Sequence, residues 1–164
     1  MKTAFFALAC ALPLVAFAAS SPDESFYKKA AEAGMAEVAA GHMAQEKGTS
    51  ADVKEFGAMM VKDHTAANTK LKTLAASKDV KLPDGPGMMN KAKEKKADMK
   101  SGDSFDKDYI KGQIAAHEDT IKLLQKEIDS GKDADAQAFA KETLPKVKAH
   151  LAKINAIAAS AGVK

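Results

Sequence analysis

The chain has 164 residues, of which 46% are hydrophobic, 29% charged and 5% aromatic, and its formal charge is +3. This length suits one domain, and a composition rich in Ala, Lys, Glu, Met and Leu favours helices over strands. Lysine supplies every fixed positive charge, because the sequence contains no arginine. A nucleic-acid site is expected to offer arginine for phosphates and aromatic rings for bases, so the composition argues against a nucleic-acid partner.

The first residues predict export. Lys2 gives a positive start, an apolar run covers residues 4–15, and Ala16-Phe17-Ala18 is typical of a signal-peptide cleavage site. We therefore expect a signal peptide at 1–18 and a mature domain at 19–164. The single cysteine, Cys10, lies in the apolar run, so the mature domain would have no disulfide and no thiolate ligand. No later stretch is long and apolar enough for a transmembrane segment, so we expect a periplasmic protein or one associated with the outer membrane.

Caps and apolar periodicity predict four long helices of roughly 25 residues each. They run over about 22–47, 51–77, 103–130 and 133–160. The first opens on a capping box from Ser21 to Glu24, Thr49 and Ser50 are the expected caps of the second, and Asp133 opens the fourth. Pro145 lies inside the fourth pattern and predicts a kink or a restart of the helix there.

Residues 78–102 connect the second helix to the third. They begin with a turn-forming cluster at 82–87 and continue as a short, lysine-rich helix from Met88 to Met99. This connection is far longer than the 2–8 residues that usually join antiparallel helices. It is long enough to travel the length of a bundle, so we expect an all-α fold of two antiparallel hairpins joined by a crossover.

One polar residue interrupts the apolar seam of each long helix. The seam residues follow a 4-3-4-3 spacing, and the interruptions are Glu37, His64, His117 and His150. Seam positions are buried, so each of these polar groups needs a partner. All four lie near the middle of their helices, so a bundle brings them to a similar height. In contrast, His42 is rotated by about 140° from Glu37 and is expected to face away.

One carboxylate and three imidazoles at one place are suitable ligands for zinc, iron, manganese or copper. The sequence therefore predicts that Glu37, His64, His117 and His150 hold one divalent metal ion. Asp63 is expected to accept a hydrogen bond from a ring N–H of a ligand, as carboxylates near metal sites often do. A metal-free alternative stays open, in which Glu37 accepts hydrogen bonds from the imidazoles and the buried network sets the helix register.

Five segments of the mature chain match a known family in order between about residues 26 and 157. They are AGMAEV at 33–38, MVKDH at 60–64, FDKDY at 105–109, AH at 116–117 and TLPKVKAHL at 143–151. They resemble the domain of unknown function 4142 family, exported bacterial proteins often labelled outer-membrane proteins. The resemblance implies a ferritin-like four-helix bundle and export, and it implies no activity. The family pattern falls on Glu37, Asp63, His64, Asp106, His117 and His150.

A di-iron centre is not expected. Ferritin-like di-iron sites need Glu-x-x-His motifs, but Val61, Ile114 and Val147 stand three residues before the three histidines. The sequence also has no Gly-x-Ser-x-Gly elbow or phosphate-binding loop, so it gives no support for an enzyme. We expect an exported bundle that binds one metal ion, in envelope metal handling or stress tolerance. The alternative is a metal-free structural or interaction module, and the sequence identifies no protein partner.

Overall fold

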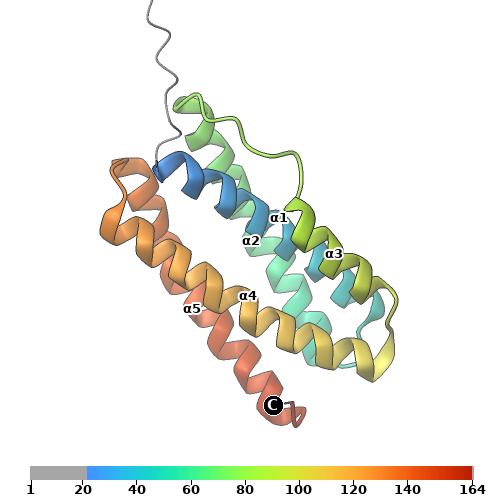
Figure 1. Ribbon diagram of the computed structural model, residues 1–164. Coiled ribbons are helices and arrows are strands. Elements are labelled where there is room, and N and C mark those ends of the chain that lie inside the picture. Colours follow the sequence, from blue (N-terminus) through green and yellow to red (C-terminus); the bar gives the residue numbers. More distant parts are fainter. Residues whose placement is uncertain (1–21, 164) are drawn as a thin grey trace, which may run out of the picture.

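The computed structural model describes residues 22–163, which form an all-helical bundle (Figure 1). Its helices are α1 (Pro22–Lys47), α2 (Ala51–Ser77), α3 (Gly87–Asp98), α4 (Gly102–Ser130) and α5 (Ala134–Ser160). The predicted helices agree with these bounds to within about two residues. The expected signal peptide at 1–18, Cys10 and the Ser21 end of the capping box lie outside the described residues. Among the helices described, none is long and apolar enough to cross a membrane.

Two antiparallel hairpins make up the bundle, as predicted. α1 packs along α2 and α4 packs along α5, while α1 also contacts α4 and α2 contacts α5. After α2 the chain returns along the outside of the bundle to its opposite end before α4 begins, and α3 lies on this crossover against α1 and α4 (Figure 1). Consequently α2 and α4 run in the same direction. The fold is a ferritin-like four-helix bundle whose long crossover holds a short helix.

The carboxylate of Asp106 on α4 holds the loop between α1 and α2. It accepts hydrogen bonds from the Thr49 hydroxyl at 2.6 Å, from Ser50 N at 2.8 Å and from Thr49 N at 3.1 Å. Ser50 occupies the N-cap position of α2, but its side chain makes no capping hydrogen bond. The position of the predicted cap is therefore confirmed, but Thr49 and Ser50 act as donors to Asp106 and not as side-chain acceptors for the first turn of α2.

The start and middle of α5 test two further predictions. The Asp133 carboxylate accepts a hydrogen bond from Asp135 N at 2.9 Å, so it is the N-cap of α5, as predicted. The helix then continues unbroken through Pro145 to Ser160, so the expected restart at the proline does not occur.

Helices α1 and α2 come very close together at two glycines. A Cβ atom built on Gly41 would lie 2.6 Å from the carbonyl oxygen of Gly57, and one built on Gly57 would lie 2.7 Å from that of Gly41. A side chain at either position would push the two backbones apart. Gly112 on α4 is different, because a Cβ atom there would have nothing within 4 Å.

The apolar core consists of two clusters with a polar layer between them. One cluster contains Phe26, Leu71, Leu124 and Val147, and the other contains Ala44, Met60, Ile110 and Ile154. On each of the four long helices, the predicted polar residue lies in the sequence between a member of one cluster and a member of the other. The polar side chains are therefore enclosed by apolar packing from both ends of the bundle.

Candidate metal centre

All four side chains that the sequence placed in the seams are buried. Their relative exposure is 5% for Glu37, 8% for His64, 1% for His117 and 6% for His150. His42, in contrast, is exposed on α1 as predicted. The apolar periodicity of each helix thus identified which polar residues leave the solvent.

The structure brings the three buried histidines together from three helices. One ring nitrogen each from His64 on α2, His117 on α4 and His150 on α5 lies within 4.8 Å of the other two. The ring centroids are 5.6–6.0 Å apart. Nitrogens held at about 2.1 Å from a tetrahedral zinc ion lie roughly 3.4 Å from one another. Ring rotations that move each nitrogen by about 1 Å would therefore produce ligand geometry.

Hydrogen bonds fix which nitrogen of two of the rings faces the centre of the triad. His117 Nδ1 lies 2.8 Å from the backbone carbonyl oxygen of Gln113, one turn earlier on α4, and donates its proton to it. His150 Nε2 lies 3.0 Å from Oδ2 of Asp63 on the facing helix α2 and donates to that carboxylate. In the neutral form of each ring, which carries one N–H, these bonds leave a lone pair on His117 Nε2 and on His150 Nδ1. This arrangement is typical of metal-binding histidines.

Three buried ring nitrogens have no hydrogen-bond partner in the described structure. They are His64 Nε2, His117 Nε2 and His150 Nδ1. A buried polar atom without a partner costs about 1–3 kcal/mol. The metal-free network would require hydrogen bonds from the imidazoles to Glu37. None of these three nitrogens forms such a bond. A cation among them would satisfy all three together.

Burial lowers the pKa of two of the three histidines. It lowers the pKa of His64 to about 3, with a further decrease from the nearby His117 and His150 rings. It also lowers the pKa of His117 to about 4, against the opposing effect of the hydrogen bond to the Gln113 carbonyl. Both rings are therefore neutral at pH 7, and the neutral ring is the form that binds metals.

Glu37 is buried on α1 but does not belong to the group of mutually close ligand atoms, which consists of the three histidines. It lies close enough to Tyr109 on α4 that its charge adds to the effect of burial, and both raise the pKa of the tyrosine hydroxyl. The role of Glu37 as a metal ligand stays a prediction.

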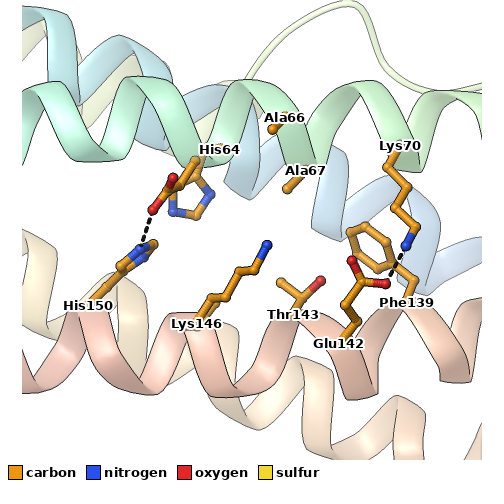
Figure 2. A pocket seen from close by; sticks show the side chains of 11 residues that line it. His64, Ala66, Ala67, Lys70, Phe139, Glu142, Thr143, Lys146 and His150 are labelled. Atoms are coloured by element: carbon orange, nitrogen blue, oxygen red, sulfur yellow. Dashed lines mark hydrogen bonds and ion pairs between the residues drawn. The ribbon is translucent and has the colours of Figure 1, made fainter.

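Two features near the triad were missed by sequence reasoning. Gln113 and Tyr109 are buried four and eight residues before His117, on the same face of α4. This spacing of four residues was the sequence signal that could have identified both side chains as buried. The second feature is a groove of about 240 Å³ between α2 and α5, whose wall includes His64 and His150 (Figure 2). It depends on the separation of two helices, and no local pattern predicts it.

Comparisons with known proteins agree with the sequence motifs. The family described as "Domain of unknown function (DUF4142)" matches residues 13–157. No curated protein matches the chain. The crystal structure of a predicted secreted protein, DUF305, from Streptomyces coelicolor is similar, with a TM-score of 0.74 and 10% sequence identity over 87% of this chain and 94% of that one. Likeness at this identity shows the fold alone. The chain belongs to the DUF4142 family, because that family matches most of its length and places its histidines within the matched region.

Proposed function

We propose that this protein binds a single divalent transition-metal ion through His64, His117 and His150. One observation carries the proposal: three buried imidazoles from three helices each leave a ring nitrogen without a hydrogen-bond partner, and one ring nitrogen of each lies within 4.8 Å of the other two. In the described structure these three nitrogens form no hydrogen bonds with one another, although the rings pack with centroids 5.6–6.0 Å apart. A cation is the simplest group that satisfies them all.

The chemistry of the surrounding groups favours one ion rather than two. A bridged di-iron centre uses several carboxylates. Here the Asp63 carboxylate accepts a hydrogen bond from His150, and Glu37 lies outside the close group of ligand atoms. Three imidazoles suit zinc, copper, iron or manganese. Glu37 is the candidate for a further ligand if the ion draws its carboxylate inward.

We place this binding in the cell envelope, in metal handling or stress tolerance. The basis is the signal-peptide pattern at 1–18 and the structurally similar DUF305 protein, which is itself named as secreted. We propose binding because the sequence has no Gly-x-Ser-x-Gly elbow or phosphate-binding loop that would point to a particular reaction.

The test is elemental analysis of protein purified from the periplasm without a polyhistidine tag. We expect about one metal ion per chain, and we expect His64→Ala and His117→Ala to lose it. His42→Ala is the matched control, because it removes an exposed histidine from the same fold and should leave the metal content unchanged. The metal content of Glu37→Gln tests separately whether the Glu37 carboxylate is a metal ligand.

Thermal unfolding gives a second measurement. A ligand at 100 times its Kd stabilises the folded state by about 2.7 kcal/mol, so the metal should raise the Tm of the wild type but not that of His117→Ala. Wild-type protein that stays metal-free after incubation with each of the four metals would overturn the proposal. If the histidine variants were then also less stable, the metal-free network would be the correct interpretation.

A further inference from the structure

The groove between α2 and α5 connects the histidine triad with the surface. His64 and His150 line it and are buried, whereas Lys70, Glu142 and Lys146 line it and are exposed, so the histidines lie at its deep end. His117 is not part of its wall. A metal ion in the triad would therefore have one side facing this groove. Sites with three protein ligands commonly keep such a position open for an exogenous ligand.

The size of the groove limits the ligand. Its volume of about 240 Å³ is below the roughly 300–1,000 Å³ of pockets for drug-sized molecules. Beyond the charged residues, its wall consists largely of small or apolar side chains, including Ala66, Ala67, Phe139 and Val147. A molecule of a few non-hydrogen atoms fits such a space.

The charges along the groove select for an anion. Lys70 forms an ion pair with Glu142 across the two helices, so these two charges cancel. Lys146 extends from α5 across the groove toward α2 (Figure 2), and its charge also acts on the Glu142 carboxylate, whose pKa it helps Lys70 to lower. The Asp63 carboxylate is held by the His150 ring. Even with the negative charge of Asp63 counted, a divalent ion and the Lys146 ammonium would leave this end of the groove positively charged.

Resting on the metal binding proposed above, we infer that the groove takes a small oxyanion of the carboxylate class. One oxygen of the anion binds the open side of the metal, and another accepts a hydrogen bond from Lys146. Lys146 lies one helical turn before His150, so both reach the groove from the same face of α5. In this role Lys146 contacts the anion and has no part in holding the metal.

Cobalt provides the test, because the visible absorption of Co²⁺ reports changes in its ligands. The mature chain is loaded with Co²⁺ and titrated with acetate. We expect a saturable spectral change in the wild type and an acetate Kd about 10–100-fold weaker in Lys146→Gln, the loss typical of one charge-assisted hydrogen bond. The affinity for Co²⁺ itself should stay within about threefold of the wild type. Lys148→Gln, which removes an exposed lysine from the same helix outside the groove, should behave as the wild type.

The outcomes separate this inference from the proposal on which it rests. If Co²⁺ does not bind the wild type, the metal site and the anion site both fail. If Co²⁺ binds but acetate leaves its spectrum unchanged, or if Lys146→Gln binds acetate as tightly as the wild type, the metal site stands and the anion site is wrong.

Discussion

Replacing Gly57 by alanine should destabilise the protein, although alanine is the better helix former. Removing a glycine from a helix interior gains about 1 kcal/mol. At Gly57, however, the new Cβ atom would lie 2.7 Å from both the Gly41 carbonyl oxygen and the Ala44 Cβ atom. Both atoms belong to α1, and the oxygen is part of its backbone, so relief requires the two helices to separate. Such overpacking costs about 1–3 kcal/mol and sometimes more.

The net expectation for Gly57→Ala is a loss of up to about 2 kcal/mol and a decrease in Tm of up to roughly 8 °C. The matched control is Gly112→Ala on α4, where the added methyl group meets nothing within 4 Å. That variant should gain up to about 1 kcal/mol, so the same substitution has opposite signs at the two positions. Urea denaturation and thermal unfolding of both variants measure this difference. Two variants that are stabilised equally would refute the close approach of α1 and α2.

Three further predictions concern single carboxylates. Asp106→Ala should lower the free energy of unfolding by about 2–3 kcal/mol, because the α1–α2 loop loses its charged acceptor; a loss below about 0.5 kcal/mol in urea denaturation would contradict this. Burial and the neighbouring Asp23 raise the pKa of Glu127 from 4.5 to about 7, so the stability it contributes is complete below pH 4.5 and is lost as the pH rises through 7. Glu127→Gln should therefore be about 1–3 kcal/mol more stable than the wild type at pH 8 and similar to it at pH 4.5, and equal stability at both pH values would count against the shifted pKa. Asp63→Ala should weaken metal binding about 10–100-fold by releasing the His150 ring, which competition with a chelator measures; unchanged affinity would show that this hydrogen bond does not orient the ligand.

Much of the fold could be predicted from sequence because helix caps and apolar periodicity are local properties. The 4-3-4-3 seams identified Glu37, His64, His117 and His150 as buried, and the same reasoning placed His42 at the surface. The length of the connection at 78–102 indicated the crossover. Local rules were less successful where a residue finds its hydrogen-bond partner on another helix. Ser50, for example, holds the N-cap position that its type predicts, but its side chain makes no capping hydrogen bond and its backbone N–H donates to Asp106 of α4.

The sequence by itself determined the helices, the face that each one buries, and the presence of polar groups on that face. Only the tertiary structure decided how those groups meet: that three histidines form a close group without Glu37, that Asp63 accepts the predicted ring N–H from His150 in particular, and that Lys146 lies over a groove. It also decided that Gly41 and Gly57 face each other while Gly112 faces open space. The physical reason is that the apolar periodicity of a single helix determines which of its residues are buried. Contacts between helices depend on their relative rotation, offset and separation, which are set by the packing of the whole core.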